Sequence, residues 1–362
     1  MITLLMFVAG LAALVVGADL LVRGASKLAI SLGISPLVVG LTVVAFGTSS
    51  PEMAVSAQSA WSGSTDIAIG NVVGSNLFNV LFILGLCATI VPLVVASQII
   101  RQEVPIMIGA SLLLVALTLD GGLSRAESAL LFGLLLAYTA FLVVQSRRSQ
   151  GQPVDQEFRR ELAEPGSPAW DDRTVVQIGL VIAGLVLLVI GSNWLVEAAI
   201  AFARTLGVSE LIIALTIVAA GTSTPEVAAS LMALRKGERD MAVGNVIGSN
   251  TFNILGVLGL SGLVAPAALT MPESLLRFDL PAMVAVAIAC LPVFFSGRRI
   301  ARWEGLMFLG YYVAYVAYLI LAASDHDALT TYATVMTWVV IPLTVATLVA
   351  VLWRGARDAS PR

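Results

Sequence analysis

The sequence predicts an all-α polytopic membrane protein with two inverted five-helix repeats, which supply ten core transmembrane helices, and one extra C-terminal transmembrane helix. Three observations support this fold class. The 362 residues are 58% hydrophobic and 12% charged, whereas soluble domains carry about 25% charged residues. Long apolar stretches recur along the whole chain, and one segment occurs twice at a constant spacing.

Eleven apolar stretches predict helices that cross a bilayer. In chain order they are 2–21, 34–61, 67–91, 104–119, 125–145, 174–195, 208–234, 241–265, 277–296, 302–322 and 331–353. The first has no positive residues ahead of its apolar run, which a secretory signal peptide would have, so we expect it to be retained.

One long polar stretch, 146–173, separates the fifth and sixth predicted helices. Its three prolines argue against a continuous helix, so we interpret it as a cytoplasmic linker. The predicted organisation is therefore a first repeat, the linker, a second repeat, and an extra helix with a cytoplasmic tail. The corresponding ranges are 1–145, 146–173, 174–322 and 323–362.

The basic residues predict the orientation, because cytoplasmic loops are enriched in Lys and Arg. With the N-terminus outside, seventeen of the twenty basic residues fall on the cytoplasmic side. The three exceptions are Arg125, Arg204 and Arg277. This distribution predicts a multi-pass protein of the cell (inner) membrane with its C-terminus in the cytoplasm.

The repeat is visible in the letters of the chain. Residues 66–81 read DIAIGNVVGSNLFNVL and residues 240–255 read DMAVGNVIGSNTFNIL, with eleven of sixteen positions identical. The same offset of 174 carries GTSSPE at 47–52 onto GTSTPE at 221–226. Because five helices is an odd number, the two copies are expected to lie in opposite orientations, as in many secondary transporters.

Each copy of the shorter motif places a glutamate directly after a proline. A proline inside a helix removes one hydrogen bond and clashes with the carbonyl four residues earlier, so Pro51 and Pro225 predict helix breaks. Irregular backbone at membrane depth is tolerated where it lines a cavity, and a glutamate there indicates a functional site. Carbonyls, hydroxyls and the carboxylates of Glu52 and Glu226 are oxygen ligands of the kind that hard cations bind.

The longer motif adds polar residues on one helix face, since positions four apart lie together. Ser75 and Asn79 have this spacing, and so do Ser249 and Asn253. The glycine pairs of the same helices, at 70 and 74 and at 244 and 248, predict close helix packing. Two carboxylates match one divalent cation or two monovalent cations, and their mutual repulsion when empty would favour obligatory exchange.

These motifs resemble the two alpha-repeats of the calcium/cation antiporter superfamily, and most of all its prokaryotic sodium/calcium exchanger branch. The resemblance extends through the tenth predicted helix. It implies exchange of calcium for sodium by alternating access, with the first and sixth helices sliding across a core that holds the ions.

The resemblance also implies ligands. For calcium these are Glu52 and Glu226 with the backbone carbonyls of Thr48 and Thr222. The sodium sites would add the following residues: Ser49, Ser75, Asn79, Ser223, Ser249 and Asn253, with the carbonyls of Ala45 and Ala219. Characterised exchangers often have aspartate where this chain has Asn253, so a proton-coupled calcium or other cation antiporter stays as the alternative.

Competing interpretations come from other classes of protein. A cation channel would use the same acids as a filter, but no ring-forming filter sequence is present. An intramembrane enzyme is not expected, because no nucleophile has a partner base and the single histidine, His326, falls in a predicted outside loop. The alternative role of Glu52 and Glu226 is that of buried carboxylates that only bond a neighbouring helix. The alternative role of Asn71 and Asn245 is to cap or bridge the broken helices.

The expected ligands and partners follow from this interpretation. We expect no cofactor beyond the transported calcium and sodium ions, and no protein partner is evident. The lipid bilayer surrounds the chain, and no basic surface for nucleic acid is present. The two isolated cysteines, Cys87 and Cys290, give no zinc-site spacing.

Overall fold

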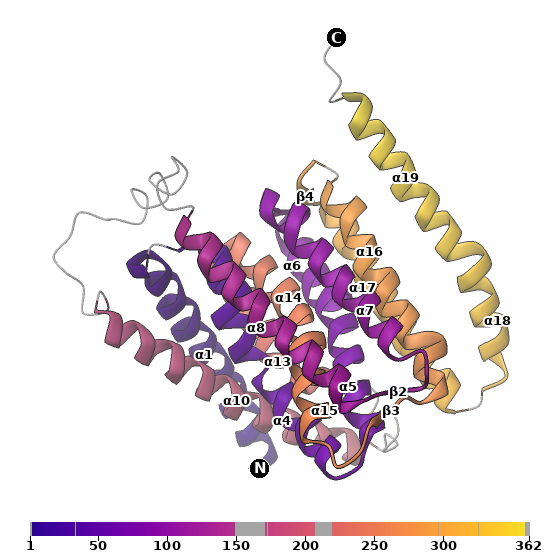
Figure 1. Ribbon diagram of the computed structural model, residues 1–362, viewed down its shortest axis with the longest axis horizontal. Coiled ribbons are helices and arrows are strands. Elements are labelled where there is room, and N and C mark those ends of the chain that lie inside the picture. The colour runs from indigo at the N-terminus through magenta and orange to yellow at the C-terminus, as the bar shows by residue number, and fades with distance from the viewer. Residues whose placement is uncertain are drawn as a thin grey trace.

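The computed structural model describes residues 2–32, 34–148, 171, 173–206, 219–295, 297–324 and 326–358, and these residues form a bundle of long helices (Figure 1). Within the described ranges, nine helices are long and apolar enough to cross a membrane. A tenth span is formed by two shorter helices that meet at an angle of 45°. The predicted all-α polytopic fold is confirmed. The predicted helix 208–234 lies partly outside the described residues.

The first half of the chain contains the one bent span among the described residues, Leu37–Thr48 with Ser50–Trp61, and four spans without such a bend. Its elements are α1 (Ile2–Leu32), α2 (Pro36–Val39), η1 (Gly40–Val44), α3 (Ala45–Thr48), α4 (Ser50–Trp61), α5 (Thr65–Leu77), η2 (Phe78–Leu84), α6 (Gly85–Ile90), β1 (Leu93–Val94), η3 (Ile99–Glu103), α7 (Val104–Leu117), β2 (Gly122–Leu123) and α8 (Arg125–Arg148). The η elements are π-helical turns within longer helices.

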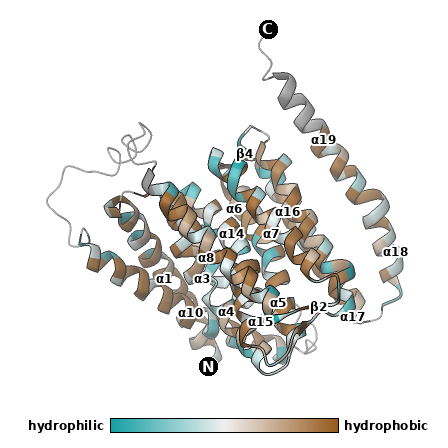
Figure 2. Cartoon of the chain, viewed as in Figure 1, coloured by the Kyte–Doolittle hydropathy of each residue, from teal (hydrophilic) through white to brown (hydrophobic). Residues whose placement is uncertain are grey.

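The second half repeats this order. Its elements are α10 (Thr174–Thr205), α12 (Ala219–Thr222), α13 (Thr224–Arg235), α14 (Arg239–Phe252), η5 (Asn253–Leu258), α15 (Gly259–Val264), β3 (Leu269–Thr270), η6 (Leu275–Asp279), α16 (Leu280–Phe295), β4 (Arg299–Ile300), α17 (Arg302–Ala323), α18 (Ala328–Val335), η7 (Met336–Val340) and α19 (Ile341–Asp358). Hydrophobic residues cover most of the helices, and hydrophilic residues gather near helix ends and around β4 (Figure 2).

The helices α1 and α10 pack against each other as an antiparallel pair. A Cβ atom on Gly10 would lie 2.9 Å from the carbonyl oxygen of Gly191, and one on Gly17 would lie 2.9 Å from that of Gly184. The glycines recur every seven residues on both helices, so one face of each stays in contact with the other. Small residues on a shared face allow two membrane helices to approach this closely.

Both helices are longer than the sequence predicted. The predicted spans 2–21 and 174–195 are wrong at their ends, because α1 continues to Leu32 and α10 to Thr205. Arg23 and Lys27 therefore lie inside α1, where both bond the buried carboxylate of Asp171. The Lys27 ammonium and the Arg23 guanidinium hold the pKa of that carboxyl below its usual range.

Two short strand pairs, which the sequence did not predict, join the loops of the two halves. The strand β1 pairs with β4, and β2 pairs with β3, both antiparallel. Each pair brings together two loops that the predicted topology places on the same side of the membrane. The pairing therefore agrees with the predicted alternation of the helices.

The centre of the bundle is occupied by α5 and α14. Residues 241–251 of α14 are buried without interruption, and the helix packs against η1, α2, α3 and α13. In contrast, the C-terminal segment α18–α19 lies at the edge of the bundle (Figure 1). It contacts α16 and α17 and encloses an apolar cavity of about 360 Å³ with them.

Candidate cation site

The helix breaks lie where the sequence predicts them. In the first copy α3 ends at Thr48 and α4 begins at Ser50, with Pro51 in the first turn of α4. In the second copy Ser223 separates α12 from α13 in the same way. Each glutamate thus lies in the first turn of a helix, where the partial positive charge of the helix end favours an acidic side chain.

The two glutamates are joined by crossed hydrogen bonds between the copies. Ser223 donates its hydroxyl to Glu52 Oε1 at 2.8 Å, and Ser49 donates to Glu226 Oε1 at 3.1 Å. Ser223 also contacts Ser75 at 3.1 Å between their hydroxyl oxygens. Both carboxylates are 0% exposed. The motifs that lie 174 residues apart in sequence therefore meet in one buried cluster.

Within the described part of the chain, five buried oxygen atoms of predicted ligand residues have no hydrogen-bond partner. They are Glu52 Oε2, Glu226 Oε2, Asn79 Oδ1, Asn253 Oδ1 and Ser249 Oγ. Buried polar atoms almost always have partners, and an exception needs an explanation such as an ion. Two other buried hydroxyls without a partner, Ser26 Oγ and Ser261 Oγ, lie outside the predicted ligand set. Bound cations are one explanation for unpaired oxygens at the predicted ligands.

Another buried carboxylate, that of Glu103, was not expected from the sequence and provides an internal comparison. It is also 0% exposed, but both of its oxygens are satisfied. Gln98 and Gln102 donate to Oε1 at 3.0 and 2.7 Å, and Tyr138 donates to Oε2 at 2.6 Å. Burial alone therefore does not leave a carboxylate oxygen unpaired in this fold.

The asparagines at 71 and 245 bridge the broken helices. Asn71 accepts a hydrogen bond from Thr222 Oγ1 at 3.2 Å and donates to Ser56 Oγ at 3.0 Å. Asn245 repeats the pattern, accepting from Thr48 Oγ1 at 3.2 Å and donating to Ser230 Oγ at 3.0 Å. The hydroxyls of both threonines are thus engaged across the two halves.

Asn79 and Asn253 lie in the π-helical segments η2 and η5. Such wide turns occur mostly as single bulges and are frequent at functional sites. These turns were not expected from the sequence, and neither was a role for Asn76 and Asn250. Those two side chains accept hydrogen bonds from Asn253 and Asn79, at 3.1 and 3.0 Å.

The remaining predicted ligands are backbone carbonyls. The carbonyl of Ala45 accepts the N–H of Ser49 at 3.0 Å and the hydroxyl of Thr48 at 3.4 Å. Its counterpart Ala219 begins the described part of α12. The ligand roles of both alanines stay predictions.

The predicted close packing of glycines is observed in the second copy. A Cβ atom on Gly248 would lie 2.8 Å from the Cα of Leu41, and one on Gly244 would lie 3.1 Å from the carbonyl oxygen of Leu37. The equivalent contacts of Gly70 and Gly74 would involve residues 211 and 215, which lie outside the described residues.

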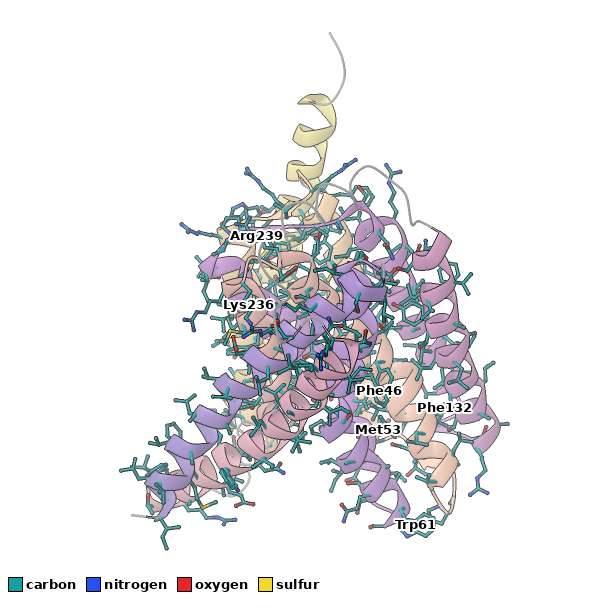
Figure 3. The ribbon with its side chains drawn as sticks, turned by 90° about the vertical axis from the view of Figure 1, so that its left-hand side faces the viewer. Phe46, Met53, Trp61, Phe132, Lys236 and Arg239 are labelled. Carbon is teal, nitrogen blue, oxygen red and sulfur yellow. The ribbon has the colours of Figure 1, made fainter. Side chains whose placement is uncertain are left out.

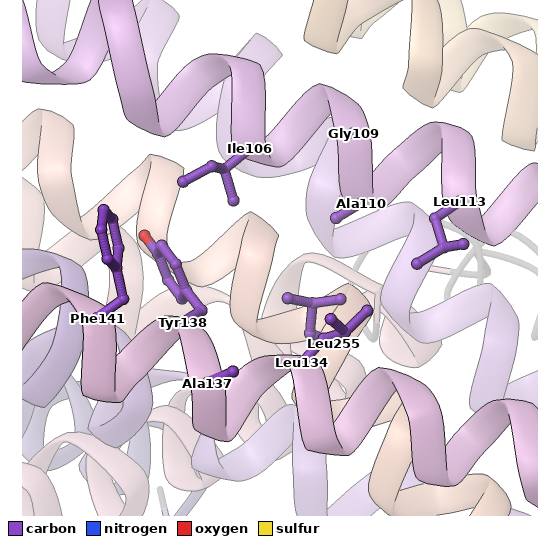
Figure 4. A pocket seen from close by; sticks show the side chains of 9 residues that line it. All are labelled: Ile106, Gly109, Ala110, Leu113, Leu134, Ala137, Tyr138, Phe141 and Leu255. Atoms are coloured by element: carbon purple, nitrogen blue, oxygen red, sulfur yellow. The ribbon is translucent and has the colours of Figure 1, made fainter.

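Two apolar cavities lined by described residues do not include the glutamates. One, of about 370 Å³, lies between α7 and α8 and is apolar apart from Tyr138 (Figure 4). The other is the cavity beneath α18–α19. Within the described ranges, no group of three or more His, Cys, Asp or Glu side chains is placed to hold a metal. A cation at the two glutamates would therefore need neutral oxygens as its other ligands.

Comparison with known proteins places this geometry in a family. The family model described as "Sodium/calcium exchanger protein" matches residues 2–144 and 176–321. The chain is 34% identical over 346 residues to sodium/calcium exchanger MaX1 of Methanosarcina acetivorans, with 88% of this chain and 98% of the relative covered. It is 36% identical over 314 residues to inner membrane protein YrbG of Escherichia coli, with 87% and 95% covered.

The fold comparison agrees with the sequence comparison. The solved structure of the sodium-calcium exchanger NCX_Mj, soaked without Na⁺ and Ca²⁺, has a TM-score of 0.74 at 28% identity. It covers 88% of this chain and 98% of its own. Members of this family are transporters and not enzymes, which confirms the class predicted from the repeated motifs. The chain is a multi-pass membrane protein and belongs to the sodium/calcium exchanger protein family.

Proposed function

We propose that this cation antiporter exchanges calcium for sodium by alternating access, with Glu52 and Glu226 as paired ligands near the middle of the membrane. The observation that carries the proposal is the set of unpartnered buried oxygens contributed by both halves of the chain. Calcium binds six to eight oxygen ligands, including carboxylates, amide carbonyls and backbone carbonyls. The cluster supplies carboxylate and amide oxygens in symmetry-related pairs.

The charge of the cluster suits this cargo. No basic side chain of the described residues pairs with either glutamate. When both carboxyls are ionised, their charge of −2 is neutralised by one Ca²⁺ or two Na⁺ ions. Two negative charges in a medium of low dielectric constant repel each other strongly. A carrier with this site would change conformation readily when loaded and reluctantly when empty, which couples the two ion fluxes.

The complete burial of both carboxylates favours a carrier over a channel. With 0% exposure for Glu52 and Glu226, ions reach the site only after helices move. Inverted-repeat transporters achieve this by moving one group of helices against the other around a fixed site. The antiparallel α1–α10 pair is the natural mobile group, since it packs mostly against itself along its length.

Sodium ions are proposed to use the hydroxyl and amide oxygens around the glutamates. Ser49 and Ser223 already contact the carboxylates, and Ser75 contacts Ser223. The printed names of MaX1 and NCX_Mj describe sodium/calcium exchangers, and this similarity supports the same ion pair here. The name of YrbG describes an inner membrane protein, which supports a location in the cytoplasmic membrane.

A flux experiment with the purified chain in liposomes tests the proposal. Radioactive calcium uptake is measured under an outward sodium gradient, an outward proton gradient, and no gradient, with the membrane potential clamped. We expect rapid uptake under the sodium gradient alone. The ionophore-treated sample, in which the sodium gradient is abolished, serves as the control.

Each other outcome names a different mechanism. Uptake under the proton gradient alone would replace sodium by protons as the coupling ion. Uptake that needs no counter-ion would indicate a channel. An absence of calcium flux under every gradient would overturn the proposal altogether.

A further inference from the structure

Four asparagine side chains form a network where α5–η2 meets α14–η5. Asn76 donates its amide to the backbone carbonyl of Asn250 at 3.4 Å, and Asn250 donates to that of Asn76 at 3.3 Å. Their side-chain oxygens accept the amides of Asn253 and Asn79. All four asparagine side chains are buried. The network is symmetric, since each bond has a counterpart in the other half of the chain.

The network determines which end of each amide points in which direction. A backbone carbonyl only accepts hydrogen bonds, so the NH₂ group of Asn76 must face the carbonyl of Asn250. The Oδ1 atom of Asn76 then faces Asn253 at 3.1 Å from its Nδ2, and Asn253 must present its NH₂ group there. The oxygen of Asn253 is consequently turned away from Asn76, and it is the buried Oδ1 without a partner. The same argument turns the oxygen of Asn79 away from Asn250.

Sulfur contacts support this assignment. The Nδ2 atom of Asn76 lies 3.4 Å from Met283 Sδ, and that of Asn250 lies 3.6 Å from Met107 Sδ. A thioether sulfur is a weak acceptor and never a donor. Both methionines therefore face the NH₂ groups, as the backbone carbonyls do.

We propose that Asn76 and Asn250 are positioning residues for the cation site. Asn76 holds the amide of Asn253, and Asn250 holds the amide of Asn79, so that the Oδ1 atoms of Asn253 and Asn79 face the cation. This inference rests on the proposed function. Without the network, each ligand amide would be free to rotate and present an NH₂ group, which repels a cation. The two positioning residues would not touch the ion themselves.

The same network disfavours an ionised carboxylate at positions 79 and 253, because each of these side chains must donate a hydrogen bond. A carboxylate at position 253 would place a second acceptor oxygen against Asn76 Oδ1, and two acceptors facing each other without a hydrogen are unfavourable. An aspartate at position 79 would meet Asn250 Oδ1 in the same way. With asparagine at both positions, the charge of the site is the −2 contributed by Glu52 and Glu226. An aspartic acid at position 253 would fit the network only in its protonated form, which can donate its O–H to Asn76 Oδ1.

Double-mutant cycles test whether each positioning residue acts through its partner. Asn76→Ala should raise the KM for calcium uptake about fivefold, the size expected for one hydrogen bond, with little change in maximal rate. The effect should disappear in an Asn253→Ala background and persist in an Asn79→Ala background. Asn250→Ala should show the reverse dependence. Asn76→Ser, which removes less volume, repeats the cycle if the alanine variant does not fold.

The cross-pairs are matched controls, because a loss of packing would add to both backgrounds equally. An equal increase of KM in both backgrounds, or no increase in the single variants, would overturn the inference. Protection of the purified chain by calcium against thermal unfolding separates this failure from that of the proposed function. If calcium protects the unmodified chain and the Glu52→Gln variant loses that protection, the site stands whatever the cycles show. If calcium neither protects nor is transported, the proposed function itself fails.

Discussion

At the scale of single residues, the difference between a structural and a ligand carboxylate lies in what satisfies its oxygens. Glu103 has donors on both oxygens, whereas Glu52 and Glu226 each receive one hydroxyl and leave the other oxygen unpaired. An unpaired buried acceptor costs about 1–3 kcal/mol, and more when it is charged. A fold that retains two such oxygens in equivalent positions has a use for them.

Glutamine substitutions at these positions test the distinction. We expect Glu52→Gln or Glu226→Gln to lower calcium exchange roughly a hundredfold, since a charged contact is worth about 3 kcal/mol and the site loses half its charge. Glu103→Gln is the matched control. It should leave exchange within about twofold while lowering thermal stability, because its three donors lose a charged acceptor. If all three variants exchanged calcium as fast as the unmodified chain, Glu52 and Glu226 would not be ligands of the site.

The sequence was sufficient to find the glutamates but not their supporting residues. Glu52 and Glu226 follow prolines in apolar segments. The energetic cost of burying a carboxylate in the membrane, together with this position, identifies them without a structure. Asn76 and Asn250 lie one helical turn before Asn79 and Asn253 and are set apart from them by the neighbours that they meet across the interface. That difference depends on how two helices dock, and no local pattern records it.

At the scale of helices, the breaks were predictable and the lengths were not. Pro51 and Pro225 prevent the helix from continuing, and the breaks occur beside them. The helix α1 continues past Arg23 and Lys27, and both side chains bond the carboxylate of Asp171, which lies 144 positions beyond Lys27 in the chain. A span predicted from hydropathy ends at the first charged residues, so the predicted length of such a helix is too short.

The glycine face of α1 gives a second prediction. Gly17→Ala would place a methyl group 2.9 Å from both the Gly184 carbonyl oxygen and the Leu188 nitrogen. Because these are backbone atoms, the helices must separate, and we expect a loss of about 1–3 kcal/mol of stability, as for overpacked cores. Gly179→Ala on α10 is the control, since that position is exposed and an added Cβ there meets nothing within 4 Å.

Thermal unfolding of the detergent-purified variants measures the difference. The Gly17→Ala protein should unfold at a lower temperature than the unmodified chain, and Gly179→Ala should unfold at the same temperature or slightly higher, because alanine favours helix over glycine. If both variants had the same midpoint temperature of unfolding, the helices α1 and α10 would be farther apart at Gly17 than they are in the structure.

At the scale of the whole molecule, contacts between the two halves have counterparts in which the equivalent residues have exchanged halves. Gly10 meets Gly191 while Gly17 meets Gly184, and each pair maps onto the other under the offset of 174. Trp61, at the end of α4, lies toward one end of the molecule, whereas Lys236 and Arg239, which follow α13, lie toward the other end (Figure 3). The sequence repeat predicted this arrangement, but it contained no sign of the strand pairs that join the loops.

The inverted arrangement predicts that equivalent loop residues face opposite sides of the membrane. Ser62 and Lys236 occupy the same position after α4 and α13, and both are exposed. The two native cysteines, Cys87 and Cys290, are buried, so a membrane-impermeant thiol reagent should not label the unmodified chain. Lys236→Cys removes an exposed ion pair with Asp19 and a hydrogen bond to the backbone carbonyl of the same residue. Exposed ion pairs contribute about 0–1 kcal/mol.

Labelling of intact cells therefore reads out the topology directly. Ser62→Cys should react from outside, because the predicted orientation places the loop after α4 there. Lys236→Cys should react only after the cells are opened, because the loop after α13 is predicted to be cytoplasmic. Labelling of both variants from the same side would contradict the inversion of the repeats. Labelling with the sides exchanged would leave the inversion intact and reverse the orientation drawn from the basic residues, so one experiment separates the two inferences.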